Sequence, residues 1–189
     1  GLNNYTNGAA ARAVQDIVGV QFRNMATVGG SVWGRFGFSD VLTFLLSMET
    51  SVELYHGGVV PLERFVSMKR DNDLLLRILI QKKDGVFVYQ SMRNQRTDFP
   101  VLTCAFSRVD GQYRAVIGAR PARAMVIPDR DGILNGGITL EKPGIFAAYT
   151  AQHVPTGTNL RGSAAYRTHL TEVLTRRSLL ELGGIEKWK

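Results

Sequence analysis

The sequence is poor in the residues that build metal centres and disulfides: its 189 residues include one cysteine and three histidines. Cys104 alone cannot close an internal disulfide or supply a cysteine-based zinc or iron–sulfur site, so a reducing, cytoplasmic setting is the default expectation. His56, His153 and His169 stand far apart and outside any H-x-x-x-H or H-E-x-x-H spacing. We therefore expect no metal site on this chain.

Other absences narrow the function classes. No apolar run approaches 18 residues, which excludes a membrane-spanning helix. No P-loop, G-x-S-x-G or complete G-x-G-x-x-G is present, so hydrolase and nucleoside-triphosphatase functions have no support. The residues after Gly1 lack a basic and apolar leader and also lack an initiator Met. We expect a fragment of a longer polypeptide without a secretory signal.

The composition is that of a globular protein. Hydrophobic residues make up 44% of the chain and charged residues 21%, and this length can bury a core. The net charge of +7 invites a nucleic-acid function, but lysine and arginine are dispersed from Arg12 to Lys189. Without a basic stripe that carries exposed aromatics, a solvated face or a partner contact explains this charge better than nucleic acid does.

Hydrophobic periodicity predicts an α+β protein in which strands precede the last helices. Helices are expected at residues 9–18, 40–48, 143–152 and 163–182, the third and fourth closing the chain. Strands are expected at 50–54, 59–62, 74–81, 85–92, 101–108, 112–117 and 124–127. Asp110-Gly111 should form a hairpin turn, and residues 20–28 alternate loosely before a turn at Gly29-Gly30. A boundary near residues 82–85 divides the chain into 1–82 and 83–189.

The segment Thr27-Val28-Gly29-Gly30-Ser31 is the most informative motif. Two glycines followed by serine can present successive backbone N–H groups with no Cβ in the way, as phosphate-binding nests do. Thr27 and Ser31 add hydroxyl groups, and Asp40 could accept hydrogen bonds from the ribityl or ribose hydroxyls of the same ligand. Taken alone the motif is weak, because a Gly-Gly pair is more often a simple turn and Asp40 could instead cap the helix that follows it.

Two segments together resemble a known family. The run FRNMATVGGSVWGRFGFSDVLTFLLSMETSVELY is similar to the I-R-N-x-A-[TS]-[IV]-G-G-N and S-D pattern of the FAD-binding middle subunit or domain of the molybdenum hydroxylases. This group includes xanthine dehydrogenase and carbon monoxide dehydrogenase. The segment LRGSAAYRTHLTEVLTRRSL, residues 160–179, is similar to the family's D-x-R-[GA]-S-x-x-Y-R signature. The resemblance spans nearly the whole chain.

The resemblance implies a fold and a set of cofactor contacts. Residues 1–82 would be the C-terminal part of a PCMH-type FAD-binding domain, and 83–189 would be a small antiparallel sheet with a C-terminal helical bundle. The residues implied to contact FAD are Thr27, Gly29, Gly30 and Ser31 at the pyrophosphate, Asp40 on the ribityl side and Leu75 near the isoalloxazine. No catalytic residue is expected, because the flavin performs the redox chemistry.

The chain also departs from the family pattern. Ser31 replaces the usual asparagine, Gly34 a small hydroxyl residue, Gln90 the lysine of some members and Asn159 the aspartate. The family's first flavin loop, A-G-G-[TH]-[DN], has no counterpart. We therefore expect FAD to be weakly bound or absent in this chain by itself. We also expect apolar surface, exposed where the absent subdomain would pack, to promote homo-oligomers.

Two functions follow from these observations. The first is an FAD-binding electron-transfer component that takes electrons from an iron–sulfur subunit, beside a molybdopterin subunit, and passes them to NAD or another acceptor. The alternative is a non-flavin scaffold or subunit-docking module with a degenerate FAD site. For Arg161, Tyr166 and Arg167 we favour hydrogen bonding between C-terminal helices over flavin contact, and for Cys104 a buried structural thiol over a nucleophile.

Overall fold

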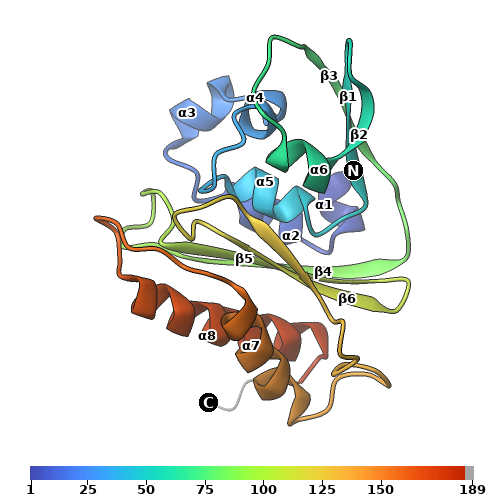
Figure 1. The fold of residues 1–189 in the computed structure, drawn as a ribbon, viewed down its shortest axis with the longest axis vertical. Helices are drawn as coiled ribbons and strands as arrows, with labels where there is room; N and C mark the ends of the chain where they lie inside the picture. The colour runs from blue at the N-terminus through green and yellow to red at the C-terminus, as the bar shows by residue number, and fades with distance from the viewer. Residues whose placement is uncertain (186–189) are drawn as a thin grey trace.

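The structure is a computed structural model that describes residues 1–185, and it places two antiparallel sheets among helices (Figure 1). The N-terminal helices are α1 (Leu2–Tyr5), α2 (Ala9–Val14), α3 (Val20–Met25), α4 (Val28–Trp33) and α5 (Asp40–Leu45). They precede a three-stranded sheet of order β2-β1-β3, made of β1 (Thr50–Leu54), β2 (Gly58–Pro61) and β3 (Leu75–Ile80). Helix α6 (Leu62–Ser67) connects β2 to the segment before β3.

A four-stranded sheet forms the middle layer of the molecule. Its order is β4-β5-β6-β7, from β4 (Gly85–Met92), β5 (Leu102–Val109), β6 (Gln112–Gly118) and β7 (Met125–Pro128). Helices α7 (Lys142–His153) and α8 (Ala164–Leu182) cover one face, while the N-terminal helices and the small sheet lie on the other (Figure 1). The mixed helix and sheet architecture predicted from the sequence is thus confirmed.

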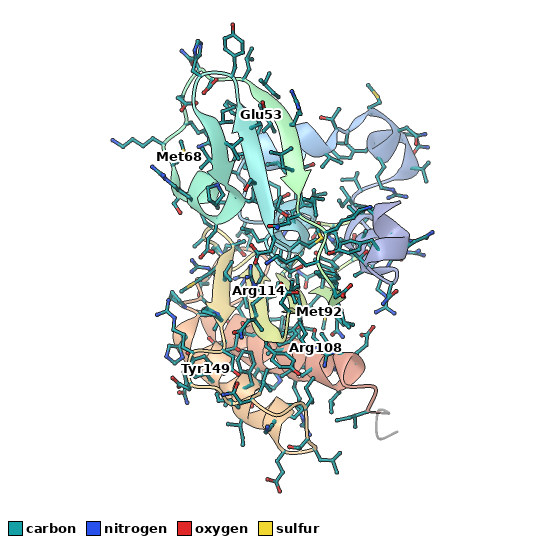
Figure 2. All side chains as sticks on the ribbon, turned by 90° about the vertical axis from the view of Figure 1, so that its right-hand side faces the viewer. Glu53, Met68, Met92, Arg108, Arg114 and Tyr149 are labelled. Atoms are coloured by element: carbon teal, nitrogen blue, oxygen red, sulfur yellow. The ribbon has the colours of Figure 1, made fainter. Side chains whose placement is uncertain are left out.

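Each face of the four-stranded sheet borders its own hydrophobic core. Phe87 and Ala105 contribute to the core shared with the N-terminal helices, and Phe106 contributes to the core under α7 and α8. Because side chains alternate along a strand, one sheet can serve both cores. Figure 2 shows Glu53 and Met68 in the half with the small sheet and Arg108 and Tyr149 in the other. Among the helices described, none has the length and apolar character that a bilayer crossing requires.

The strand predictions are confirmed almost residue for residue. The hairpin between β5 and β6 turns at Asp110 and Gly111, whose φ angles are 48° and 78°. Two successive positive φ values define the tight turn that an Asp-Gly pair favours between antiparallel strands. Helix α8 also begins as predicted, because the Ser163 side chain caps it by accepting a hydrogen bond from Tyr166 N. Local chemistry decided these boundaries.

The helix predictions near the N-terminus need correction. The helix predicted over residues 9–18 ends at Val14, and Val18 has a φ of 47° that no α-helix allows. Residues 20–28, which alternate loosely, form α3 and the start of α4, and α1 was not predicted. A six-residue helix supplies too few positions for periodicity to separate it from a strand.

Helix α5, which begins at Asp40, lies in the interior of the protein. All six of its residues, from Asp40 to Leu45, are buried, which explains why apolar side chains surround it. It packs against α2 and α4 and against strands β5 and β6. A helix held on several sides positions its first residue accurately, and that residue is Asp40.

Candidate functional site

The motif around Gly29 and Gly30 borders a cavity of about 390 Å³. Three chain segments build its wall: the region from α2 to α4, the loop before α5 and the loop after β4. They contribute Ile17, Val18, Phe22, Ala26, Thr27, Gly30, Ser31, Phe36, Phe38, Ser39, Asp40, Arg93, Asp98 and Phe99. The cavity therefore joins Thr27, Gly30, Ser31 and Asp40, and we call it the site cavity.

The glycine pair lies in the first turn of helix α4 and not in a separate turn or nest. Thr27 caps this helix: its Oγ1 accepts from Gly30 N at 3.0 Å and its carbonyl accepts from Ser31 N at 3.1 Å. Within residues 1–185, the amides of Val28 and Gly29 make no hydrogen bond. The predicted run of free N–H groups is thus reduced to these two donors, together with the Thr27 and Ser31 hydroxyls.

Position 30 requires glycine because a side chain would lack space there, and not because of the backbone conformation. A Cβ at Gly30 would lie 3.1 Å from Thr27 Oγ1, within the capping interaction. The φ of Gly30 is not in the left-handed region, so the backbone conformation at this position does not require glycine. Crowding against Thr27 is the physical constraint at this position.

Gly29 and Leu75 lie together, outside the lining of the site cavity. A Cβ at Gly29 would lie 3.9 Å from Leu75 Cδ2, an ordinary van der Waals distance. Leu75, on β3, is partly buried and packs against the N-terminal core. The contacts of these two residues with a cofactor stay predictions.

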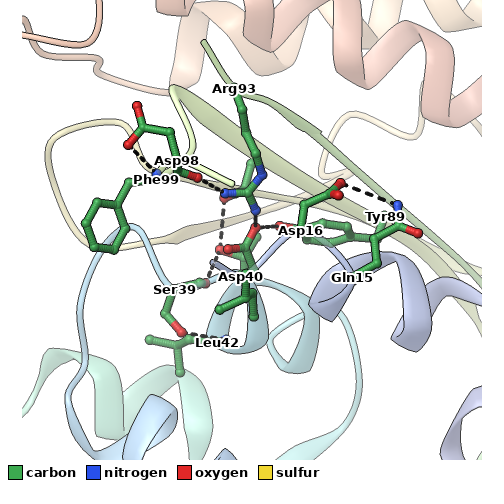
Figure 3. Close-up of polar contacts among 12 residues, drawn as sticks. Gln15, Asp16, Ser39, Asp40, Leu42, Tyr89, Arg93, Asp98 and Phe99 are labelled. Atoms are coloured by element: carbon green, nitrogen blue, oxygen red, sulfur yellow. Dashed lines mark hydrogen bonds and ion pairs between the residues drawn. The ribbon is translucent and has the colours of Figure 1, made fainter. Parts of the chain in front are cut away.

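Asp40 is buried and already bonded to two side chains on or beyond strand β4 (Figure 3). Its Oδ1 accepts hydrogen bonds from the Tyr89 hydroxyl and from Arg93 Nη2. The side chains of Arg93 and Asp40 are 7% and 6% exposed, so this is a buried ion pair. Sequence reasoning missed Tyr89 and Arg93, which lie 49 and 53 residues from Asp40 and share no motif with it.

The capping role considered for Asp40 belongs to its neighbour. Ser39 is the N-cap of α5, and its Oγ accepts from Leu42 N at 3.2 Å, while Asp40 is the first helical residue. Burial raises the pKa of Asp40 above the usual carboxyl range, and its bonds to Arg93 and Tyr89 oppose that rise. Burial likewise raises the pKa of Tyr89. The Asp40 carboxylate and the Tyr89 hydroxyl are bonded to each other and Asp40 is also bonded to Arg93, so the site suits binding better than acid–base chemistry.

Arg93 also ties the loop after β4 to the cavity. Its Nη1 donates to the carbonyl of Asp98 at 2.6 Å, while its buried Nε has no hydrogen-bond partner in the described part of the chain. Phe99, the residue after Asp98, lines the cavity. One guanidinium thus fixes both Asp40 and the loop that carries Phe99.

The second family-like segment makes a different kind of site. Arg167, on α8, is completely buried and donates to the carbonyls of Val101 and Gly157 at 2.9 and 2.7 Å and to Asn159 Oδ1 at 2.6 Å. The prediction that Arg167 forms hydrogen bonds between helices is therefore wrong. Arg167 instead connects α8 to a strand and a loop. Arg161 pairs with Asp98 at 3.3 Å.

Tyr166 and Cys104 lie outside the lining of the site cavity. Tyr166 is 40% exposed and does not line the site cavity. Cys104 lies buried on β5, with Ser178 Oγ 3.8 Å from its sulfur, and burial raises its pKa to about 11. A buried thiol with a raised pKa is a poor nucleophile, in keeping with a structural role.

Comparison with known proteins finds a family match in the N-terminal part of the chain. Residues 3–82 match the family model described as the FAD binding domain in molybdopterin dehydrogenase. YgfM of Escherichia coli K12, an uncharacterized protein, is 24% identical over 153 residues, which cover 80% of this chain and 56% of that protein. The nicotine 6-hydroxylase medium subunit of Paenarthrobacter nicotinovorans is 23% identical over 188 residues, covering 92% of this chain and 66% of that subunit.

Solved structures share the fold over almost the whole chain. Carbon monoxide dehydrogenase from Hydrogenophaga pseudoflava superposes with a TM-score of 0.84 at 19% identity, covering 97% of this chain and 69% of that one. Quinoline 2-oxidoreductase from Pseudomonas putida 86 gives a TM-score of 0.79 at 18% identity, with coverage of 97% and 72%. The chain thus spans about two thirds of these structures and little more than half of YgfM.

The residues around the site cavity fit one side of FAD. The hydroxyls of Thr27 and Ser31, which line the cavity, and the free N–H groups of Val28 and Gly29, which lie outside its lining, suit phosphate oxygens, while Asp40 suits sugar or ribityl hydroxyls. The match of residues 3–82 to the FAD binding domain in molybdopterin dehydrogenase confirms the resemblance to FAD-binding middle subunits of molybdenum hydroxylases that the sequence indicated.

Proposed function

We propose that this chain supplies one wall of the FAD site in the electron-transfer component of a molybdenum-containing hydroxylase or dehydrogenase. The observation that carries the proposal is the site cavity, which unites Thr27, Gly30, Ser31 and Asp40 inside the segment that matches the FAD-binding domain family. When bound, FAD supplies the capacity to accept and release electrons. The protein contributes binding, orientation and electrostatics.

Each residue of the proposed site has a distinct task. The Gly29 amide and the Thr27 and Ser31 hydroxyls bind pyrophosphate oxygens, and Gly30 leaves room for their approach. Asp40 accepts a hydrogen bond from the ribityl chain through its Oδ2, because Oδ1 is bonded to Tyr89 and Arg93. Leu75 is assigned to the neighbourhood of the isoalloxazine by resemblance alone.

The partners follow from the same proposal. An iron–sulfur subunit would deliver electrons, a molybdopterin subunit would oxidise the substrate, and NAD or another acceptor would receive the electrons. The name "medium subunit" of the Paenarthrobacter relative supports a place in such an assembly. We also propose that residues 1–82 and 83–189 act as two subdomains, since the family match ends at residue 82 and the chain passes there from the small sheet to the large one.

The exposed surface supports a covering partner for the N-terminal helices. Val20, Phe22, Met25 and Val28 are 59%, 50%, 86% and 55% exposed on α3 and α4. Clustered apolar side chains of this size are usually covered by another protein surface. We propose that a further FAD-binding subdomain covers them in the assembly, and that the chain by itself forms homo-oligomers at high concentration.

A scaffold without flavin is the second candidate function. The observation that favours it is the state of Asp40, whose Oδ1 already binds two donors without a ligand, so the ion pair with Arg93 can serve stability alone. In that case the site cavity would take no flavin. The two functions differ in one measurable property, which is FAD binding.

The experiment is a titration of the purified chain with FAD, followed by calorimetry and visible absorption. We expect Asp40→Ala to weaken FAD binding by roughly 1 to 3 kcal/mol, the usual range for a hydrogen bond to a charged group. Asp131→Ala is the matched control, since Asp131 is exposed and lies outside the cavity lining. Because the chain supplies one wall of the site, we expect weak binding by the chain alone. Failure to bind FAD at millimolar concentration, both alone and together with a polypeptide that carries the rest of the site, would overturn the proposal and favour the scaffold.

A further inference from the structure

A second cavity, with a volume of about 290 Å³, lies beside the site cavity. Phe38 and Phe99 line both of them, so these two side chains lie between the two spaces. The rest of its wall comes from Gly37, Pro100, the β6–β7 loop and the turn before α8. None of the residues assigned to FAD lines this wall, and we keep the name second cavity for it.

Backbone contacts hold the wall that the β6–β7 loop contributes. The Ala119 amide donates to the carbonyl of Gly37 at 2.6 Å, and Ala119 has a φ of 55°, a left-handed conformation that is uncommon for a residue with a side chain. A Cβ at Gly37 would lie 2.1 Å from the carbonyl oxygen of Ala122, so glycine allows the two backbones to touch. Such a conformation persists where the surrounding structure fixes it. The second cavity is therefore formed before any ligand arrives.

The size and the surface of the second cavity point to a small planar ligand. Ligand pockets usually enclose about 300 to 1,000 Å³, so this cavity is at the lower end of the range and has room for one ring or two fused rings but not for a dinucleotide. Phe38 and Phe99, with ring centroids 4.5 Å apart, are 39% and 44% exposed. Pro100 and Pro121 add further apolar surface. A flat ring can pack against these side chains.

Arg161 brings a positive charge to the wall of the second cavity. Its Nη2 pairs with Asp98 at 3.3 Å, and its guanidinium lies 5.0 Å from the centre of the Phe99 ring, so both contacts hold the group in place. Within residues 1–185, its Nη1 and its buried Nε make no hydrogen bond. Because the side chain is 37% exposed, Nη1 is accessible to a ligand. Arg161 can therefore bind an anionic oxygen in the cavity.

Asn159 adds a second donor beside Arg161. Its Oδ1 accepts from Arg167 Nη2 at 2.6 Å and from the Arg161 amide at 2.9 Å, which fixes the orientation of the side-chain amide. With Oδ1 engaged in this way, Nδ2 remains as a donor for a ligand. An aspartate at position 159 could keep both hydrogen bonds but would place a negative charge beside Arg161. The asparagine of this chain thus makes the second cavity favourable to an anion.

We propose that the second cavity binds a small planar organic anion, an aromatic or heteroaromatic carboxylate, at a site separate from that of FAD. The ring lies against Phe38 and Phe99, and the carboxylate accepts hydrogen bonds from Arg161 and from Asn159 Nδ2. An anion without a ring leaves the apolar wall in contact with water. A ring without a charge leaves the donors of Arg161 without a strong acceptor. The two halves of the site therefore act together in selecting the ligand.

The experiment is a calorimetric titration of the purified chain, without FAD, with three probes. Benzoate carries the ring and the carboxylate, benzyl alcohol carries the ring without the charge, and acetate carries the charge without the ring. We expect benzoate to bind at millimolar concentration and at least about tenfold more tightly than either of the other two probes. Absence of benzoate binding would overturn the proposal. Equal affinity for benzoate and either partial probe would overturn it as well.

Asn159→Asp locates the carboxylate of the probe. The substitution changes little in shape and keeps an acceptor for Arg167, so the chain should stay folded, which thermal melting checks. Benzoate affinity should fall at least about tenfold, and Arg161→Met should lower it in the same way. Arg176→Met is the control, because Arg176 is exposed on α8 and lies outside the cavity lining. Unchanged benzoate affinity in folded Asn159→Asp would place the anion elsewhere and end the proposal.

The result is independent of the proposed function, because the titration contains no flavin. If FAD binds and benzoate does not, the second-cavity proposal fails while the FAD site stands. If benzoate binds with the expected response to Asn159→Asp and FAD does not bind, the second-cavity proposal stands while the FAD proposal fails.

Discussion

Arg93 and Arg167 are both buried, and they occupy opposite sides of the four-stranded sheet in different chemical settings. Arg93 pairs with a carboxylate, Asp40, on the wall of a cavity. Among the residues that the structure describes, Arg167 donates only to neutral oxygens, from Val101, Gly157, Gly162 and Asn159. A cation whose donors are all bonded to neutral oxygens of the protein holds the fold together, whereas Asp40, in an ion pair beside a cavity, keeps its Oδ2 for a ligand. The first family-like segment thus lines a cavity, and the second holds the fold.

The largest expected effect is on stability, from Arg167→Met. The substitution leaves several buried carbonyl oxygens without a donor, and each such group costs roughly 1 to 3 kcal/mol. We expect the free energy of unfolding to fall by about 3 kcal/mol and Tm by about 6 to 12 °C, measured by urea and thermal denaturation. Arg161→Met, which removes a half-exposed ion pair, should cost under about 1 kcal/mol. Equal costs for both variants would contradict the architectural role of Arg167.

The second-largest effect is expected from Gly30→Val, at the site cavity. A branched side chain there meets Thr27 Oγ1 and the path of the pyrophosphate, so FAD affinity should fall at least about tenfold, or roughly 1.4 kcal/mol. Loss of the Thr27 cap should cost about 1 kcal/mol of stability. In the control Gly29→Ala, the added Cβ has ordinary contact with Leu75 and keeps the amide donor. Unchanged FAD affinity in Gly30→Val would remove Gly30 from the site.

The serine residues that cap α5 and α8 can be compared in the same way, with smaller expected effects. Ser39 caps α5 and lines the site cavity, while Ser163 caps α8 and does not. Ser39→Ala and Ser163→Ala should each lower the free energy of unfolding by about 1 kcal/mol. Of the two, only Ser39→Ala should also weaken FAD binding, because it loosens the start of the helix that positions Asp40. Denaturation and calorimetry on the same preparations measure the free energy of unfolding and the FAD affinity. A loss of FAD affinity in Ser163→Ala would contradict the assignment of the site to the Ser39 side of the sheet.

The smallest expected effect is a shallow pH dependence of stability from Asp40. Burial raises its pKa above the unfolded value of about 3.9, so the folded chain holds this proton more tightly than the unfolded chain does. The resulting stability is fully present below the unfolded pKa and is lost as the pH rises through the folded pKa. The free energy of unfolding, relative to Asp40→Asn, should therefore decrease over the pH range above about 4. An increase over that range would show that attraction to Arg93 outweighs burial.

Much of the fold was accessible from local sequence signals. The Asp-Gly turn and the Ser163 cap act within a few residues of themselves, so the β5–β6 hairpin and helix α8 were predicted with nearly correct bounds. The short helices α1, α3 and α4 were not predicted, because four to six residues do not reveal a period. The prediction of a nest at Gly29-Gly30 is wrong for the same reason: these residues begin α4, which is too short to show a helical period.

By itself the sequence determined the strand order along the chain, the turn chemistry and the grouping of Thr27, Gly29, Gly30, Ser31 and Asp40 in one motif. Only the tertiary structure decided which of these share a cavity, since Gly29 turns toward Leu75 on β3 while Asp40 meets Arg93 from beyond β4. It also decided that Phe36, Phe38 and Phe99 form one surface. The physical reason is that a buried charge or a stacked ring is satisfied by whatever the fold brings near it, across separations of about 50 residues or more, which no local pattern records.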